Sequence, residues 1–472
     1  MTQGDYDVIV IGAGTVGENV ADYATQGGMT VALVEAELVG GECSYWACMP
    51  SKALLRAGSV LRAARSVQGA AGAVTGGVDP AAVFARRTRI TGGMDDSGQA
   101  EWVAGAGIDL IRGHARFTGV KRMQVTGSDG SVIELTARHA VAVCTGSAPL
   151  MPDIPGLADI SAWSSRDATS ATRAPASLAI LGGGVVGVEM ATAYASFGTR
   201  VTLISRGGLL AGNEPFAGEL VGAALERSGV SVRSGVTATE AHRTASNAVL
   251  TLSDGHRVIA EEVLVATGRV PRTGDMGLET IGLSGGEWLE VDDTMRVAGY
   301  DWLYAVGDAN HRALLTHQGK YQARVAGAVI AARAAGQSVD DAPWGRHTAS
   351  ADAASVPQVT FTDPEVASVG LTAEAAEKAG RRIRILDYDL AALAGATVHS
   401  DDYVGRARAI VDDERNVLIG ATFVGPDVGE MLHAATIAIV GEVPLARLWH
   451  AVPSYPTLSE VWLRWLEQDA RR

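Results

Sequence analysis

The feature that most constrains the fold is a glycine-rich segment that occurs twice in the chain. The segment Gly12-x-Gly14-x-x-Gly17 follows the apolar run from Asp7 to Ile11, and Gly182-x-Gly184-x-x-Gly187 follows the apolar run from Ser177 to Ile180. Each leads into a helical stretch and then a second apolar run. A strand that turns through glycines into a helix and returns as a strand is the unit of a parallel α/β sheet. The sequence therefore predicts two doubly wound, Rossmann-like domains.

The first glycine segment has the features of a dinucleotide site. Its glycines permit a tight turn, close approach of the backbone to a pyrophosphate and tight packing of the helix, whose N-terminal amides favour an anion. Glu35 closes the following strand, where a carboxylate accepts from a ribose hydroxyl. We predict that Gly12, Gly14, Gly17 and Glu35 bind a dinucleotide; the alternative is a glycine-rich turn without a ligand.

The second segment differs at the position that selects the nucleotide. The strand after Gly182, Gly184 and Gly187 ends in Ser205 and Arg206 instead of an acid. An acid would repel a 2′-phosphate, whereas an arginine can form a charge-assisted hydrogen bond with it. The sequence therefore favours NADPH over NADH, with NADH still possible. The alternative is that Arg206 is an ordinary solvated surface charge.

A length of 472 residues indicates several domains. Two strands end in Thr-Gly turns, at Thr145-Gly146 and before Gly268, and a third ends in Gly-Asp at Asp308. The alternating strands and two helices beyond a polar linker predict an α+β terminal domain. The expected domain limits are residues 1–150 together with 271–345, residues 151–270, and residues 346–472.

The composition restricts the partners and the compartment. The formal net charge of −14 would repel nucleic acid and anionic lipid, so neither is an expected partner. The N-terminus lacks a secretory signal, and the apolar runs are too short to span a membrane. We therefore expect a cytoplasmic protein. The sequence indicates no metal site.

Two of the three cysteines lie close together, at Cys43 and Cys48. An undistorted α-helix would separate their Cα atoms by about 7.5 Å along its axis, on different faces, which a disulfide does not tolerate. Cys43 must therefore precede or distort the first turn, and Gly40-Gly41 and Pro50 are compatible with such an entry. The alternative is a pair of buried, inert cysteines. Cys144 lies in an apolar strand and is expected to be core.

The segment Gly-Gly-x-Cys-x-x-x-x-Cys-x-Pro-Ser-Lys, from Gly40 to Lys52 between the two glycine motifs, resembles the pyridine nucleotide-disulfide oxidoreductases, nearly end to end. The resemblance implies that residues 1–150 and 271–345 bind FAD at the first motif, near Gly41, Thr145, Gly146 and Asp308. It also implies that residues 151–270 bind NAD(P)H and that residues 346–472 form the interface of a homodimer. It implies that Lys52 lies by flavin N5 and pairs with Glu189, and that Gly268 lies at the NAD(P)H site. In the family, Cys48 exchanges electrons with the flavin and Cys43 with the substrate.

The chain departs from the family near its C-terminus. Disulfide-reducing members carry a His-Pro there whose histidine acts on the other subunit; here Tyr455 occupies the histidine position and Glu460 is retained. A phenol with an ordinary pKa of about 10 is a poor proton shuttle at neutral pH. Ordinary lipoamide or glutathione turnover is therefore not expected. Mercuric reductases end in a vicinal cysteine pair, which this chain lacks.

Three hypotheses remain. The leading one is an NAD(P)H-dependent flavoprotein that passes electrons through Cys43 and Cys48 to a small acceptor, such as an atypical disulfide or small thiol compound, a quinone or a metal ion. The second is direct transfer from the flavin to a quinone or a second nucleotide, as in the soluble transhydrogenases, which also carry Tyr-Pro-Thr. The third is a non-catalytic nucleotide-bound subunit or redox sensor, which the retained Lys52, Glu189 and both cysteines argue against.

Overall fold

The structure is a computed structural model that describes residues 2–471. The chain divides into two compact units. Unit 1 runs to Pro50 and includes Thr88–Leu150 and Arg269–Asp352, and unit 2 comprises Ser51–Arg87, Met151–Gly268 and the remainder from Ala353. The sequence-based domain boundaries stay a prediction.

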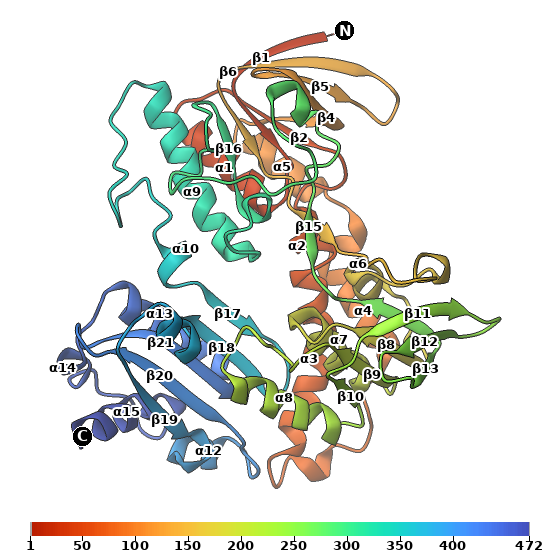
Figure 1. The fold of residues 1–472 in the computed structure, drawn as a ribbon, viewed down its shortest axis with the longest axis vertical. Coiled ribbons are helices and arrows are strands. Elements are labelled where there is room, and N and C mark those ends of the chain that lie inside the picture. The colour runs from red at the N-terminus through yellow and green to blue at the C-terminus, as the bar shows by residue number, and fades with distance from the viewer. Residues whose placement is uncertain (1, 472) are drawn as a thin grey trace. The chain divides into compact units, whose positions relative to one another are not determined.

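Unit 1 is built on a sheet whose strands follow the order β3-β2-β1-β6-β5-β4, with β16 paired to β6 (Figure 1). β1, β2, β3, β6 and β16 pair in parallel, and β4 to β6 form an antiparallel meander. The strands are β1 (Thr2–Ile11), β2 (Val31–Glu35), β3 (Asp109–Arg112), β4 (His114–Gly119), β5 (Arg122–Thr126), β6 (Val132–Val143) and β16 (Leu303–Ala305), beside a small pair, β7 (Ser147–Pro149) and β15 (Arg269–Pro271).

Both faces of this sheet are buried, which explains why β1 is continuously apolar rather than alternating. Val8 and Val10 face one core, and Ile9 and Ile11 face the other. The helices of unit 1 are α1 (Thr15–Gln26), α2 (Gly41–Tyr45), α5 (Ser97–Gly105) and α9 (Thr316–Ala334). Residues of α1 and α9 pack in the same core as Val8 and Val10.

The glycines after β1 are required by close backbone contacts. A Cβ added to Gly17 would lie 1.8 Å from the carbonyl oxygen of Gly12, and Gly12 itself has a φ of +96°. The backbone amide of Gly40 also donates to the carbonyl of Ala13 at 2.7 Å. The turn from β1 into α1 is thus held against the start of α2.

Unit 2 contains the second parallel sheet, with the order β10-β9-β8-β14, and a separate antiparallel sheet, β11-β12-β13. The strands are β8 (Ser177–Leu181), β9 (Arg200–Ser205), β10 (Ser231–Ser234), β11 (Ala238–Arg243), β12 (Ala248–Leu252), β13 (Arg257–Ala260) and β14 (Glu262–Val265). The associated helices are α6 (Ser165–Ser170), α7 (Val185–Ser196) and α8 (Pro215–Arg227). β8 is buried along its whole length.

The last part of unit 2 is an antiparallel sheet of order β17-β18-β21-β20-β19, packed with helices in a core that includes Phe423 and Trp465. Its strands are β17 (Pro357–Thr360), β18 (Glu365–Gly370), β19 (Ile383–Asp389), β20 (Arg406–Asp412) and β21 (Val417–Gly425). Its helices are α11 (Ala373–Lys378), α12 (Ala394–His399), α13 (Leu432–Val440), α14 (Leu445–Leu448) and α15 (Val461–Ala470).

Three helices cross the boundaries between the two units along the chain: α3 (Cys48–Arg65), α4 (Pro80–Ile90) and α10 (Ala351–Ala354). The predicted fold class is confirmed: two parallel α/β sheets and a terminal α+β part. Local limits differ from the prediction. The strand expected from Asp301 to Asp308 is only β16, because the chain turns into a 3-10 helix at Gly307. Among residues 2–471, no helix has the length and apolar character needed to cross a membrane.

Replacing Gly17 by alanine should destabilise the protein, because the new methyl group would overlap the Gly12 carbonyl oxygen. Overpacking of this kind costs about 2 kcal/mol. We expect a melting temperature lower by roughly 4 °C or more in a thermal unfolding scan. Gly98→Ala is the matched control, since an added Cβ there meets nothing within 4 Å. An equal melting temperature for both variants would contradict the steric argument.

Candidate redox and nucleotide sites

The two cysteines lie in separate helices. Cys43 is in the five-residue helix α2, Trp46 leaves helical geometry with φ −128° and ψ −12°, and Cys48 is the first residue of α3. Gly40 and Gly41 have φ values of 104° and 58°, a backbone region that favours glycine. The prediction that Cys43 cannot share an undistorted helix with Cys48 is therefore confirmed.

Cys48 lies where an anion is stabilised. Its Sγ lies 3.3 Å from the Thr316 Oγ1, at the first residue of α9. Cys48 itself begins α3, and the unsatisfied amides of a first helical turn favour negative charge. Hydrogen bonding and helix position both favour a thiolate at Cys48.

Cys43 is the member of the pair that keeps its proton. A hydrogen bond with Cys48 raises the pKa of the Cys43 thiol most, followed by burial and by the charge of Cys48. Thr316 and Lys320 act in the opposite direction but do not reverse the shift. The hydrogen bond with Cys48 and the partial burial of Cys43 thus both favour the protonated form of the Cys43 thiol. Both side chains are only partly buried.

Lys52 and Glu189 form an ion pair within unit 2, as the resemblance implies. The Lys52 Nζ lies 2.9 Å and 3.1 Å from the two carboxylate oxygens of Glu189. Glu189 is only 3% exposed, and its Oε1 also accepts from the backbone amide of Phe361 at 3.0 Å. The Lys52 Nζ lies 4.9 Å from the centre of the Phe361 ring. The lysine is thus fixed by a buried carboxylate and an aromatic face.

The residues expected at the FAD site fit that cofactor. Gly12 and Gly17 are fixed by backbone contact, whereas a Cβ on Gly14 would meet only Gly41 Cα, at 3.9 Å. A Cβ on Gly41 would in turn lie 2.7 Å from Gly14 Cα. Space is therefore left over Gly14, beside the free amides of α1, where a pyrophosphate would need it.

Glu35 and Thr145 also suit this site. The carboxylate of Glu35 accepts from the backbone amides of Ala13 at 2.6 Å and Glu37 at 2.7 Å, which orients it at the end of β2. Its burial raises its pKa in spite of these bonds. The Thr145 hydroxyl is buried and has no hydrogen-bond partner in the part of the chain that the structure describes. It precedes Gly146, which has a φ of +71°. An unsatisfied buried hydroxyl is consistent with a ligand there.

Asp308 belongs to a partly buried polar cluster. Its Oδ2 accepts from the Ser147 hydroxyl at 2.5 Å, and Arg269 Nε lies 3.8 Å from the same oxygen. Burial raises the pKa of Asp308, while Ser147 and Arg269 oppose the shift. Sequence reasoning did not identify Ser147 or Arg269. Their pairing depends on β7 lying against β15, strands more than a hundred residues apart in the chain.

The glycines of the second segment, where NAD(P)H is expected, differ in the same way: one is required by a close backbone contact, and another has open space above it. A Cβ on Gly187 would lie 1.9 Å from the Gly182 carbonyl oxygen, while a Cβ on Gly184 would meet nothing within 4 Å. Ser205 is buried, and a Cβ on Gly183 would come 2.5 Å from its hydroxyl. Arg206 is exposed. The buried Ser205 thus packs under the turn, and Arg206 is the residue free to meet a ligand.

Gly268 is the last residue of the stretch Met151–Gly268 in unit 2, and its φ is +152°. It follows β14, whose residue Val265 pairs with Leu181 of β8 at the edge where the glycine turn begins. Gly268 is therefore placed by the same sheet as Gly182, and its role at the nucleotide stays a prediction.

Among the described residues of the chain, Tyr455 and Glu460 do not interact with each other. The Tyr455 side chain is 75% exposed, and Glu460 is buried. The Glu460 Oε1 is bound to Arg464, one turn later in the chain, and its Oε2 has no partner among residues 2–471. Glu460, which the resemblance places near the catalytic base, is therefore paired with Arg464 in this structure.

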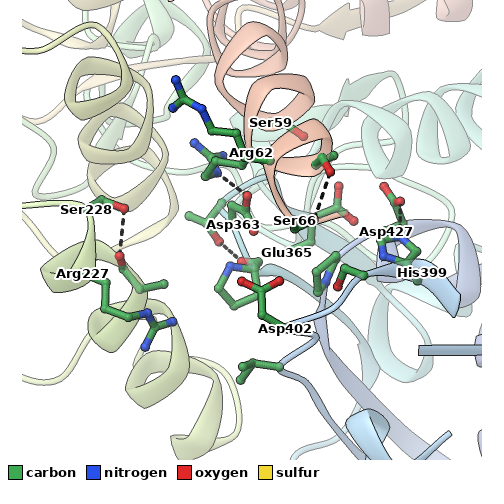
Figure 2. A pocket seen from close by; sticks show the side chains of 18 residues that line it. Ser59, Arg62, Ser66, Arg227, Ser228, Asp363, Glu365, His399, Asp402 and Asp427 are labelled. Atoms are coloured by element: carbon green, nitrogen blue, oxygen red, sulfur yellow. Dashed lines mark hydrogen bonds and ion pairs between the residues drawn. The ribbon is translucent and has the colours of Figure 1, made fainter. Parts of the chain in front are cut away.

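A further charged cavity of about 350 Å³ lies in unit 2, between the end of α3, α8 and the loops before β18 and after β21. Figure 2 shows two contacts in its lining, the ion pair of Arg62 with Asp363 and the hydrogen bond between His399 and Asp427. None of the site residues predicted from the sequence is among the described residues that line this cavity. The cavity is therefore separate from the residues expected to carry the chemistry.

Sequence reasoning missed two residues that act on the cysteines, Thr316 and Lys320, and one acid with a buried carboxylate oxygen, Glu18. Thr316 contacts Cys48, and Lys320 lies one turn further along α9 and acts on Cys43. Glu18 lies in the first turn of α1. The sequence offered only local signals: Thr316 begins a long helix, and Glu18 directly follows the third glycine of the first segment. Neither indicates a partner in a distant element.

Replacing Thr316 by valine should weaken the Cys48 thiolate, because a hydroxyl that donates to a thiolate favours the charged form. A hydrogen bond of about 1.4 kcal/mol corresponds to a rise of roughly one unit in the thiol pKa. The pH dependence of Cys48 alkylation in the reduced protein would measure it. Thr316→Ser is the matched control and should leave the pKa in place. An unchanged pKa in the valine variant would remove Thr316 from this role.

Comparison with known proteins places this geometry in a family. Residues 6–335 match the pyridine nucleotide-disulphide oxidoreductases, and residues 356–465 match their dimerisation domain. The chain is 30% identical to a mercuric reductase of Staphylococcus aureus, over 97% of this chain and 81% of that protein. It is 32% identical to a dihydrolipoyl dehydrogenase of Thermus scotoductus, over 96% and 95%.

Among solved structures, the Cu(II) complex of the HOCl-induced flavoprotein disulfide reductase RclA from Escherichia coli shares the fold. Its TM-score is 0.84 at 22% identity, over 98% of this chain and 99% of that chain. The chain therefore belongs to the pyridine nucleotide-disulphide oxidoreductases, and is an FAD-dependent enzyme that uses NAD(P)H, contains a redox-active disulfide centre and forms a homodimer.

Proposed function

We propose that the protein transfers electrons from NADPH through FAD and the Cys43/Cys48 pair to an acceptor that does not depend on an imidazole base. The observation that carries this is the Cys43 thiol, whose pKa is raised by its hydrogen bond with Cys48 and by burial, in a chain with Tyr455 at the base position. Because a thiolate is the attacking species, a protonated Cys43 reacts slowly with an ordinary disulfide. The acceptor must therefore compensate for the missing base.

Each predicted residue has a role in this proposal. FAD supplies the electron transfer between the nicotinamide and the disulfide. Gly12, Gly14, Gly17 and Glu35 would hold it at the end of β1 and β2, and Asp308 would hold its central part. Other FAD contacts would come from Gly41, Thr145 and Gly146.

The cysteines and the ion pair act at the reacting end. Cys48 would carry the thiolate, and Cys43 would meet the acceptor. Lys52, fixed by Glu189, would hold a positive charge in place beside the flavin. Tyr455 and Glu460 would reach Cys43 of the partner subunit in the homodimer, where Tyr455 is too weak a base to replace histidine at neutral pH.

A soft metal ion satisfies this requirement best. A metal that binds a thiol displaces its proton directly, so it needs no protein base. One dithiol can reduce two Cu(II) ions to Cu(I), forming the Cys43–Cys48 disulfide and releasing the thiol protons. A relative reduces mercury by name, and the RclA structure is a Cu(II) complex. A disulfide whose leaving thiol has a low pKa is the other acceptor of this kind.

The acceptor experiment compares wild type with Cys43→Ser and Tyr455→His under NADPH. We expect wild type to reduce Cu(II) and an aromatic disulfide, and Cys43→Ser to lose at least ten-fold of both activities. Lipoamide turnover should be low in wild type and rise in Tyr455→His, because imidazole can exchange the thiol proton. Cu(II) reduction that persists in Cys43→Ser would refute the dithiol route.

A second function is direct reduction of a quinone by the flavin. The raised pKa of Cys43 favours it, because it lowers the reactivity of the thiol that would meet the acceptor. Quinone turnover that survives loss of both cysteines would support this function. The same variants would then show whether a second nucleotide also accepts electrons.

The preference for NADPH is assigned to Arg206. A charge-assisted bond to a 2′-phosphate contributes about 1.5–3 kcal/mol, so Arg206→Ala should raise the KM for NADPH about ten-fold or more. The KM for NADH should change little. Arg227→Ala is the control, since Arg227 is another exposed arginine of unit 2. Equal effects on the two nucleotides, or a wild-type preference for NADH, would contradict the assignment.

A further inference from the structure

The short turn that carries Asp308 is bound by a buried side chain from a distant helix. The turn is the 3-10 helix Gly307–Asn310, directly after β16. Gln322 of α9 is 0% exposed. Its Oε1 accepts from the backbone amide of Gly307 at 2.8 Å and from the Asn310 Nδ2 at 2.9 Å. One side-chain oxygen thus binds both ends of the turn.

The backbone of this turn depends on such support. Gly307 has a φ of +74°, and His311, at the end of the turn, has a φ of +61°. This left-handed region is sparsely populated by residues other than glycine. The Gly307 amide is buried and therefore needs an acceptor in the folded protein. Removal of the Gln322 oxygen would leave that amide unsatisfied, and the turn would relax to find another partner.

A carboxylate determines which end of the Gln322 amide faces the turn. The Gln322 Nε2 donates to the Asp352 Oδ2 at 2.9 Å, so that Oε1 faces Gly307. The Asp352 side chain is 1% exposed and also accepts from the Gln318 Nε2 at 2.6 Å. An ionised carboxylate only accepts hydrogen bonds, and the reverse orientation of the amide would set its NH2 group against the Gly307 amide. Asp352 therefore orients Gln322.

The charge of Asp352 is balanced within unit 1. The Arg312 Nε lies 3.2 Å from its Oδ2, and the Arg312 Nη2 donates to the Asp293 Oδ1 at 2.7 Å. Burial raises the pKa of Asp352, and its hydrogen bonds and the charge of Arg312 oppose the shift. Asp352 is the last residue of unit 1 and lies in α10, from which the chain continues into unit 2. The turn that carries Asp308 is thus bound, through Gln322, to the segment that leaves unit 1.

The carboxylate of Asp308 is held from another side. Its Oδ2 accepts from the Ser147 hydroxyl, which in turn accepts from the Arg269 Nε at 2.5 Å. Its Oδ1 makes no hydrogen bond to another of the residues 2–471. Ser147 therefore fixes one oxygen, Gln322 fixes the backbone that carries the side chain, and the second oxygen can accept from a ligand.

We propose that Gln322 is a positioning residue for FAD. Oriented by Asp352, it fixes the Gly307–Asn310 turn so that Asp308 presents its carboxylate to the cofactor. This inference rests on the role proposed above for Asp308 at FAD. It extends the binding site to residues that are buried behind the turn and would not touch the cofactor. Without the Gln322 oxygen, FAD would have to restore the conformation of the turn when it binds, which lowers its affinity.

Release of FAD from the holoenzyme tests this role without any acceptor. The holoenzyme is diluted, and the rise of flavin fluorescence gives the dissociation rate. Gln322→Met has a side chain of similar length with no hydrogen-bonding oxygen, and should release FAD about ten-fold faster than wild type. Gln318→Met is the matched control, because it removes a buried amide that binds the same carboxylate but not the turn. It should destabilise the protein similarly in a thermal unfolding scan, and change FAD release less than about two-fold.

Gln322→Glu gives a second test with a pH signature. The new carboxyl group keeps an acceptor for Gly307 but loses the donor to Asp352. Two adjacent buried carboxyl groups share a proton at low pH and repel each other when both ionise. Relative to wild type at the same pH, FAD release should be nearly unchanged at ~pH 5 and about ten-fold faster at ~pH 8. Arg312 and Asp293, the other charged groups around Asp352, keep their charges over this range.

Wild-type release of FAD from Gln322→Met, or equal acceleration in Gln318→Met, would overturn the inference. A relative rate in Gln322→Glu that does not change with pH would overturn it as well. Asp308→Ala separates these results from a failure of the proposed site. Wild-type release in Asp308→Ala would refute the role of Asp308 and the inference with it, whereas faster release there and none in Gln322→Met would refute only the role of Gln322. The route through Cys43 is tested independently by turnover.

Discussion

The break between α2 and α3 is the constraint on which the redox centre depends. Five residues of one helix would hold the two sulfurs on different faces, so the chain ends α2 at Tyr45 and starts α3 at Cys48. The break has an electrostatic consequence as well as a steric one. It makes Cys48 the first residue of the long helix α3, where free amides stabilise an anion, and places Cys43 in the separate five-residue helix α2. One backbone feature thus distinguishes two chemically identical side chains.

The buried charges of the protein follow a common rule. Glu189 is neutralised by Lys52, and Asp308 is held by Ser147 beside Arg269. Burial of a charge is expensive unless it is paired and hydrogen-bonded, so each of these acids indicates a fixed geometry. Glu18 departs from the rule, because one of its carboxylate oxygens is buried and has no hydrogen-bond partner among residues 2–471.

Much of the fold and part of the site could be predicted from the sequence. The two glycine segments partly define their own turns, because a Cβ on Gly17 or Gly187 would overlap a carbonyl oxygen only five residues earlier in the chain. The cysteine spacing likewise forces a helix break without reference to any other element. Lys52 and Glu189 were paired only through the family resemblance, since the two residues are far apart in the chain.

The remainder depends on tertiary packing. Thr316 meets Cys48 only because α9 returns to the sheet of unit 1, and Ser147 accepts from Arg269 because β7 pairs with β15. No local pattern predicts such contacts. For Glu460, the family motif predicted the residue type but not its contact. Its side chain is bound to Arg464 of the next helical turn. A motif can preserve a residue type while the local contacts of that residue change.

The glycines of the two nucleotide segments fall into two groups: those that the fold requires, and those that leave space for a ligand. Gly12, Gly17, Gly182 and Gly187 are required by the folded backbone, and would be retained even in a descendant that had lost its cofactors. Gly14 and Gly184 have φ values of −69° and −79°, which any residue adopts, and space above them. A chain that no longer bound dinucleotides could replace these two without strain. Their presence in both segments is what a lineage still selected for ligand binding would retain.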